Sequence, residues 1–389
     1  MNDKKDSRRA FLQKTVASSL GLISAPTLIN ASGQNIRPKT EDKVIEPIWR
    51  NKKQGMQYRM LGKTGMMVSE LGMGTFPYHT EESYPVLDAS IERGINYFDS
   101  AFAYGKGEVE KNLGKYFKLR GNRDKVFLTT KLSGYGKGKY LKKIYDSLAP
   151  SQQEKLQKQA DELLAERMVL RPGYHFNYFN GQEQQLHSSY LWHVVLQQYG
   201  MKKEWKQEIR KHAYELIEGS LKRMQVDYVD VLFCPHGASG PELKDEILEE
   251  LLTEFKQKGM IKASAVSFHN DVAGNLDAAI DLGYYDVAMF AYNIANHAAV
   301  DASMHKAKRS GMGLVAMKVS RLYVMENKPD WIVDKLNSIV PGDKLSKFAK
   351  SYQWALQNPN LSCCVSQMET VEKLDDNLQA VGQVMPELS

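Results

Sequence analysis

The sequence predicts an α/β fold, a (β/α)8 TIM barrel, because short apolar runs recur along the chain, helical patterns separate them and glycines follow several helices. Eight runs fit strands, at residues 70–75, 95–99, 126–131, 228–233, 261–266, 287–290, 314–317 and 361–365. Such alternation is typical of parallel βαβ units. The 389 residues accommodate a barrel of about 250 residues together with insertions.

Amphipathic segments between the apolar runs predict the helices. They lie at residues 82–93, 206–224, 241–258, 299–310 and 343–357. Gly94, Gly259, Gly283 and Gly311 follow helical segments, where glycine readily adopts the left-handed conformation that ends a helix. We therefore expect one barrel domain over residues 57–386.

The alternation is interrupted once, by an expected insertion at residues 133–204 after the third strand, where about 2–6 residues are usual. Residues 152–170 have a helical pattern. The second half is crowded with aromatic and histidine side chains: Tyr174, His175, Phe176, Tyr178, Phe179, Tyr190, Trp192 and His193. Loops after barrel strands rise from the face that carries active sites, so the insertion is expected over or beside that face. Alternatively, its aromatic residues pack a small core of their own.

The first residues resemble a twin-arginine export signal. Residues 7–14 read SRRAFLQK, an uncharged stretch follows at 15–30, and small residues come next. A basic tail before an amphipathic helix fits less well, because the uncharged stretch begins directly after the arginine motif. We expect a signal peptide at 1–33 and a polar linker at 34–56. The mature protein is then expected in the periplasm or another extracytoplasmic space, reached through the export machinery in folded form.

Composition excludes several protein classes. Apolar residues at 42% and charged residues at 25% are ordinary globular values. Of the net charge of +6, half comes from five basic and two acidic residues within 1–33, and no basic stripe with aromatic residues indicates nucleic-acid binding. After the signal no apolar run of about 20 residues predicts a membrane span. Cys234, Cys363 and Cys364 form no CxxC pair, so neither a disulfide framework nor a metal site is expected.

Four side chains that can carry chemistry stand at the ends of predicted strands. Asp99 and Lys131 close the second and third strands, Tyr104 follows Asp99 by five residues, and His236 closes the fourth. A tyrosine with a pKa of about 10 can protonate a carbonyl oxygen if a lysine ammonium stabilises its phenolate and a carboxylate holds that lysine. A histidine can orient the same oxygen. Each residue alone fits a structural role, so only the set of four indicates carbonyl chemistry.

These segments resemble the aldo-keto reductase family. Residues 58–65 (YRMLGKTG) and 68–75 (VSELGMGT) are similar to its opening, and residues 220–224 (SLKRM) match before the fourth strand. The resemblance covers about residues 58–377 apart from the insertion. It implies an NAD(P)-dependent oxidoreductase acting on a small carbonyl or alcohol. Tyr104 is then the general acid or base, Lys131 and Asp99 tune it, and His236 orients the substrate.

The resemblance also implies a site for NADP or NAD. Its residues are Gly74, Thr75, Ser267, Met317, Lys318, Thr370, Lys373 and Asn377. The sequence departs from the family pattern at His269, where Asn is common, at Met289 in place of Gln, and at Glu369. A carboxylate at Glu369 repels a 2′-phosphate, which favours NAD. Export in folded form favours a cofactor acquired beforehand and held tightly.

The predicted function is hydride transfer by an exported oxidoreductase on a carbonyl or alcohol substrate, with sugars as one candidate class because aromatic residues of the insertion can stack on their rings. Two alternatives remain open. The departures from the family pattern fit a cofactor-binding sensor or partner-binding barrel with little turnover. An epimerase or lyase that oxidises and re-reduces one substrate on retained NAD would use the same residues.

Overall fold

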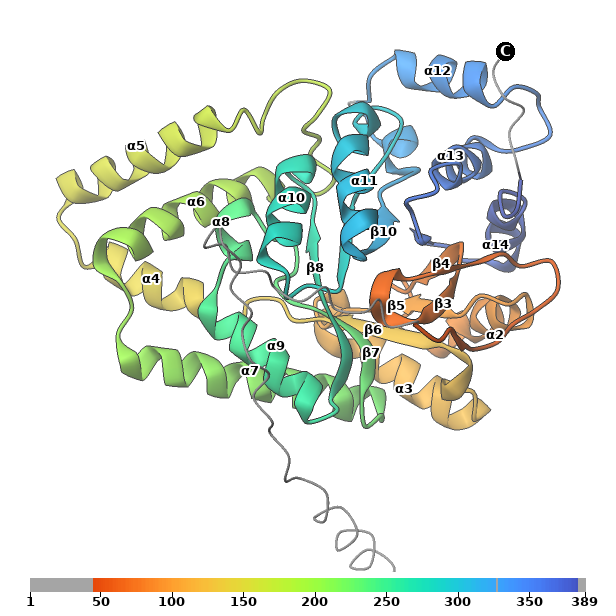
Figure 1. Cartoon of the computed structure of the whole chain (residues 1–389), viewed down its shortest axis with the longest axis horizontal. Coiled ribbons are helices and arrows are strands. Elements are labelled where there is room, and N and C mark those ends of the chain that lie inside the picture. Colours follow the sequence, from red (N-terminus) through yellow and green to blue (C-terminus); the bar gives the residue numbers. More distant parts are fainter. Residues whose placement is uncertain (1–44, 327, 384–389) are drawn as a thin grey trace, which may run out of the picture. The chain divides into compact units, whose positions relative to one another are not determined.

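The computed structural model describes residues 45–326 and 328–383, so the expected signal at 1–33 and residues 34–44 of the expected linker lie outside the described residues. Eight parallel strands close into a barrel in the order β10-β11-β4-β5-β6-β7-β8-β9 (Figure 1). They are β4 (Leu71–Gly74), β5 (Tyr97–Asp99), β6 (Phe127–Lys131), β7 (Val229–Phe233), β8 (Ile261–Phe268), β9 (Val287–Ala291), β10 (Gly313–Met317) and β11 (Cys363–Ser366). Each overlaps one predicted strand, which confirms the (β/α)8 barrel.

One helix of the surrounding ring follows each strand. The ring consists of α2 (Tyr84–Glu92), α3 (Glu108–Arg120), α7 (Lys203–Met224), α9 (Glu246–Gln257), α10 (Val272–Leu282), α11 (Asp301–Ser310), α13 (Lys347–Leu356) and α14 (Val371–Leu378). The single helix predicted at 241–258 is wrong, because it is divided into α8 (Gly240–Leu243) and α9. Asp245 between them has an extended backbone and caps α9, its side chain accepting from the Ile247 N–H at 3.0 Å.

A small sheet precedes the barrel and was not predicted. It contains β1 (Ile48–Trp49), β2 (Tyr58–Met60) and β3 (Met66–Ser69), in the order β1-β3-β2. Leu61, between β2 and β3, packs inside the barrel with Tyr97 and Phe127. Because strands β5 and β6 begin at these two residues, the small sheet closes the amino end of the barrel.

The end of the expected linker belongs to the folded part instead. β1 lies within residues 34–56, and the Arg50 guanidinium donates to the Val126 carbonyl at 2.5 Å and to Asp230 at 3.0 Å. The polar composition of this segment suggested a linker. Its place in the fold was not predicted because its contact partners are distant in the sequence.

The insertion after β6 forms three helices, α4 (Lys137–Asp146), α5 (Pro150–Glu166) and α6 (Gln182–Tyr199). Figure 1 shows them, in yellow to green, outside the ring of barrel helices and beside α8. They share an apolar core of their own that includes Leu156, Leu164, Leu186 and Val195. The helical pattern at 152–170 corresponds to α5, whereas α6 was not predicted.

Two further features complete the described part. α12 (Trp331–Ile339) lies between β10 and α13. No helix among the described residues is both long and apolar enough to cross a membrane. Cys234, Cys363 and Cys364 are buried and unpaired, and burial raises the pKa of all three thiols, so they behave as small core residues.

Candidate active site

The structure brings Asp99, Lys131 and Tyr104 together at the carboxyl ends of β5 and β6. The Lys131 ammonium lies 2.6 and 2.5 Å from the two carboxylate oxygens of Asp99, and it donates to the Ser100 carbonyl at 2.8 Å. The Tyr104 hydroxyl lies 3.2 Å from Lys131 Nζ and 3.4 Å from Asp99 Oδ2. Thr129 also donates to Asp99, at 3.0 Å. The three residues therefore form one hydrogen-bonded cluster.

The charges in this cluster do not lower the pKa of Tyr104, although the sequence led us to expect that they would. Burial and the Asp99 carboxylate raise the pKa of Tyr104 well above its ordinary value. Burial also lowers the pKa of Lys131, although Asp99 opposes that shift. Lys131 was expected to lower the tyrosine pKa, but the adjacent carboxylate offsets its charge. Tyr104 is consequently protonated at neutral pH and available as a proton donor.

A tight turn positions Tyr104. The residue begins the 3-10 helix η3 (Tyr104–Gly107), in which Gly105, Lys106 and Gly107 all have positive φ angles. A Cβ atom on Gly105 would lie 2.6 Å from the His79 ring, so this position requires glycine. The Phe76 ring packs edge-on against Tyr104 with a centroid distance of 5.3 Å. Phe76 is 52% exposed and borders the open side of the cluster.

His236 follows β7 and is held by Ser133, a residue that the sequence analysis missed. The Ser133 hydroxyl lies 2.7 Å from His236 Nδ1. Burial, with the nearby charges of Lys131 and Lys318, lowers the pKa of His236 to about 3, so its imidazole is neutral. If Ser133 donates to Nδ1, the other ring nitrogen carries the hydrogen and can donate to a substrate oxygen. The position of Ser133 in the sequence could have identified it, because Ser133 follows β6 and His236 follows the neighbouring strand.

Five of the expected cofactor residues lie at the barrel mouth: Gly74, Thr75, Ser267, Met317 and Lys318. Thr75 is fully buried, and its hydroxyl donates to the Asp99 carbonyl at 2.9 Å, so it supports the catalytic strand end. Ser267 Oγ accepts from the Gly237 N–H at 3.2 Å beside His236. Gly74 and Met317 are the last residues of β4 and β10.

Lys318 and Arg321 place positive charge at the end of β10. Lys318 has a left-handed backbone with φ 63°, and Arg321 begins the 3-10 helix η6 (Arg321–Val324). Burial, with the charges of Arg321 and Lys131, lowers the pKa of Lys318 to about 8. Neither side chain forms an ion pair within the described residues. Two cations without an ion-pair partner among the described residues, at one strand end, favour an anionic ligand.

The other expected cofactor residues are grouped at α14, away from the catalytic cluster. Thr370 caps this helix by accepting from the Lys373 N–H at 3.3 Å, and Lys373 forms an ion pair with Glu369. Asn377 donates to Ser366 Oγ at 3.1 Å, while its buried Oδ1 has no hydrogen-bond partner in the described part of the chain. The Lys373 ion pair locally offsets the Glu369 charge.

Some aromatic side chains of the insertion contact loops at the barrel mouth, and others pack in the insertion's own apolar core. Tyr178 accepts from Asn293 Nδ2 at 2.8 Å, and the Phe179 ring lies 5.1 Å from the His269 ring in an edge-on arrangement. Tyr190, by contrast, packs in the insertion core. Both expectations therefore apply, the position beside the barrel mouth to Tyr178 and Phe179 and the packing of a separate core to Tyr190.

Sequence comparison identifies the family. The profile described as "Aldo/keto reductase family" matches residues 68–168 and 193–387. An uncharacterized oxidoreductase of Bacillus subtilis, YrpG, is 40% identical over 86 residues, which cover 20% of this chain and 26% of that protein. A probable voltage-gated potassium channel subunit beta of Oryza sativa is 26% identical over 185 residues, covering 46% of this chain and 37% of that protein. The matches thus span only 26% and 37% of the length of these relatives.

Solved structures share the fold. The holo form of aldo-keto reductase AKR11C1 from Bacillus halodurans aligns with a TM-score of 0.56 at 20% identity, over 85% of this chain and 92% of that chain. An aldo-keto reductase from Klebsiella pneumoniae in complex with NADPH aligns with a TM-score of 0.57 at 15% identity over the same shares. Because the family profile matches most of this sequence and the barrel is the one that these structures share, the chain belongs to the aldo/keto reductase family of oxidoreductases.

Proposed function

We propose that the protein transfers hydride between a nicotinamide cofactor and a carbonyl or alcohol substrate. The observation that carries this proposal is the cluster of Asp99, Lys131, Tyr104 and His236 at one barrel mouth. Two of its members, the Tyr104 hydroxyl and the neutral His236 ring, can both donate to one substrate oxygen. Two donors on a single carbonyl oxygen stabilise the negative charge that develops when hydride adds to its carbon.

The roles follow from the contacts. When bound, the nicotinamide supplies or accepts the hydride. In the reducing direction the Tyr104 hydroxyl gives its proton to the substrate oxygen, and the Lys131 ammonium, 3.2 Å away, stabilises the resulting phenolate. Asp99 holds Lys131 in place through both carboxylate oxygens. His236 orients the carbonyl, and Ser133 fixes the His236 ring.

The residues at β10 and α14 suit the remainder of a dinucleotide. Lys318 and Arg321 match the charge of a pyrophosphate, and the unpartnered Oδ1 of Asn377 can accept from an adenine amino group. The related Klebsiella pneumoniae structure contains NADPH. In this chain Lys373 is occupied by Glu369, so we assign NAD as the preferred cofactor.

We further propose that the protein works outside the cytoplasm with its cofactor held tightly. The twin-arginine pattern at residues 7–14 supports this, because that route exports folded proteins. Fractionation of cells that make the full chain tests it. Arg8→Lys combined with Arg9→Lys should retain the protein in the cytoplasm, and unchanged export would contradict the proposal.

One experiment tests the central proposal. The purified, folded protein is denatured, and the released small molecules are identified by mass spectrometry. It is then assayed with nicotinamide cofactor deuterated at C4 and a small aldehyde such as propanal. We expect NAD(H) to be released or bound on titration, and deuterium to appear on the product carbon. A protein that binds neither NAD(H) nor NADP(H) would sink the hydride-transfer mechanism.

A further inference from the structure

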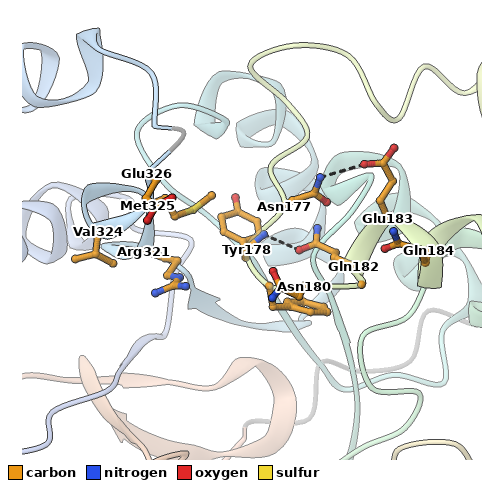
Figure 2. A pocket seen from close by; sticks show the side chains of 12 residues that line it. Asn177, Tyr178, Asn180, Gln182, Glu183, Gln184, Arg321, Val324, Met325 and Glu326 are labelled. Atoms are coloured by element: carbon orange, nitrogen blue, oxygen red, sulfur yellow. Dashed lines mark hydrogen bonds between the residues drawn. The ribbon is translucent and has the colours of Figure 1, made fainter.

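A cleft of about 510 Å³ lies between the insertion and the loop after β10, apart from the four residues of the catalytic cluster. Residues 177–184 form one wall and residues 321–326 contribute the other, and Figure 2 shows the side chains of the two walls facing each other across it. Its volume falls within the range of about 300–1,000 Å³ that is usual for small-molecule sites. The cleft is therefore large enough for a ligand of its own.

The polar groups of the cleft suit a ligand that carries hydroxyl groups. Asn180, Gln184 and Glu326 line it, and their side chains have no hydrogen-bond or ion-pair partner within the residues that the structure describes. Amides both donate and accept, and a carboxylate accepts from hydroxyls. A sugar ring presents donors and acceptors of this kind around its whole edge.

The charge of the lining disfavours a phosphorylated or carboxylated ligand. Arg321 is the cation assigned above to the cofactor pyrophosphate, and Glu183 and Glu326 give the rest of the lining two negative charges. An anion would be repelled by this net negative lining, but a neutral sugar would not. Phe179 and Val324, which are 39% and 53% exposed, add apolar surface against which the C–H face of a sugar ring can pack.

The insertion wall is held in place before any ligand arrives. Gln182 accepts from the Tyr178 N–H at 2.8 Å and donates to Asn270 Oδ1 at 2.7 Å, and the Tyr178 hydroxyl accepts from Asn293. These contacts connect the wall to the loops after β8 and β9. A preformed wall lowers the entropy lost on binding, which favours a genuine binding site over a chance opening.

One end of the cleft lies beside the catalytic cluster. Phe179, which lines the cleft, contacts the His269 ring. Burial, with the nearby charges of Lys318 and Lys131, lowers the pKa of His269 well below its ordinary value. The cleft therefore borders the loop after β8, at the same end of the barrel as the Tyr104 cluster. The family profile skips residues 169–192, so the insertion wall is a feature of this chain.

We infer that the cleft is a subsite for a neutral sugar ring attached to the part of the substrate that reacts, so that the substrate is a glycoside or oligosaccharide. The inference rests on the proposed function, since it takes the Tyr104 cluster as the place of reaction. The cleft would bind the second ring through Asn180, Gln184 and Glu326, with Phe179 beneath it.

Direct binding tests this inference without turnover. Isothermal titration of the purified full chain with cellobiose and with maltose is compared with titration by D-glucose and D-glucose 6-phosphate. We expect at least one disaccharide to bind about tenfold or more tightly than glucose, because two or three added hydrogen bonds contribute about 1 kcal/mol each. Asn180→Ala combined with Gln184→Ala should remove that gain. Gln198→Ala, an exposed residue elsewhere on α6, is the matched control and should leave it intact.

The outcomes separate this inference from the proposed function. Disaccharide binding lost in the double variant, with turnover of propanal unchanged, supports the subsite. Equal binding of glucose and both disaccharides, or binding that the double variant leaves unchanged, overturns the subsite while propanal turnover preserves the proposed function. Tighter binding of D-glucose 6-phosphate than of the disaccharides would overturn the neutral-sugar assignment. Absence of nicotinamide binding would instead overturn the proposed function, and the titrations would still decide whether the cleft binds sugar.

Discussion

The barrel mouth and the insertion are stabilised in different ways. At the mouth, Asp99 and Lys131 are 3% and 2% exposed and lie at the ends of strands bonded to neighbours on both sides. The insertion has a separate apolar core, and polar contacts such as Arg167–Asp271 and Tyr178–Asn293 connect it to the barrel loops. Under the two proposals made above, the barrel carries the reaction and the insertion selects the substrate. Each part should then respond to mutation separately.

Tyr104→Phe should separate turnover at the barrel mouth from sugar binding in the insertion cleft more clearly than any other variant. It removes the proton donor but keeps the ring that packs against Phe76, so we expect kcat to fall by about 10²- to 10⁴-fold. Sugar binding in the insertion cleft should not change. Steady-state kinetics with propanal and titration with cellobiose measure the two effects. Retained turnover would favour a different proton donor, whereas lost turnover with normal nicotinamide binding agrees with the proposed role.

Arg167→Ala tests the attachment of the insertion. The guanidinium pairs with the mostly buried Asp271, which keeps one further partner, the Tyr174 hydroxyl at 3.2 Å. Because Arg167 is partly exposed, we expect a loss of about 1–2 kcal/mol in local stability, equivalent to about five- to thirtyfold faster amide exchange in α5 and α6. Hydrogen exchange followed by mass spectrometry measures it. Lys158→Ala, on the exposed side of α5, is the control, and equal effects of both variants would contradict an anchoring role.

Ser133→Ala tests the positioning of His236. Losing the 2.7 Å contact frees the ring to adopt the other tautomer, so we expect kcat to fall about tenfold while the affinity for cofactor is unchanged. Ser133→Thr retains the hydroxyl and should restore most of the rate. NMR of the histidine ring nitrogens provides a readout independent of activity. An unchanged tautomer in Ser133→Ala would show that other contacts fix this ring.

Lys318 predicts a pH dependence of cofactor affinity. Its ammonium is charged below its pKa of about 8 and neutral above it, so attraction for a pyrophosphate is present at pH 7 and is lost as the pH rises. We expect the Kd of NADH to rise about fivefold between pH 7 and pH 9. Fluorescence titration at a series of pH values measures this. Lys318→Arg stays charged and should flatten the profile, whereas the same rise in that variant would point to another titrating group.

Glu369→Gln should produce the smallest effect. Glu369 and Lys373 are both exposed, so their interaction is weak, and removing the carboxylate frees the lysine charge for a 2′-phosphate. We expect a two- to fivefold shift of preference toward NADPH, measured as the ratio of Kd values, with sugar binding unaffected. A larger relative affinity for NADH in the variant would argue against the assigned position of the adenosine.

Local sequence patterns predicted the barrel because each strand is a short apolar run, whereas elements with distant partners were missed. β1 is only Ile48–Trp49, and its segment is held by Arg50 through contacts with Asp230, far along the chain. α6 was missed because the partly buried Trp192 and Leu196 interrupt the separation of its apolar and polar faces.

The candidate site likewise contains residues that local sequence patterns predicted and features that they missed. Asp99, Lys131 and His236 could be predicted because they close predicted strands, whose carboxyl ends must meet. The contact from Ser133 could have been inferred from its position after β6, whereas the cleft beside Phe179 depends on how the insertion lies on the barrel, which no local pattern encodes. The raised pKa of Tyr104 was also missed, because it depends on burial depth and on the distance to Asp99.

The position of residues 48–50 at the amino end of the barrel matters for attaching the protein to a support. Ile48–Trp49 pairs with β3, and Arg50 contacts the start of β6, so this entry is at the end of the barrel opposite the catalytic mouth. A fusion partner or an immobilisation tag joined ahead of residue 45 therefore starts from the rear of the barrel. Coupling the protein to a bead or a cell surface through that end would leave the mouth facing outward, open to molecules arriving from solution.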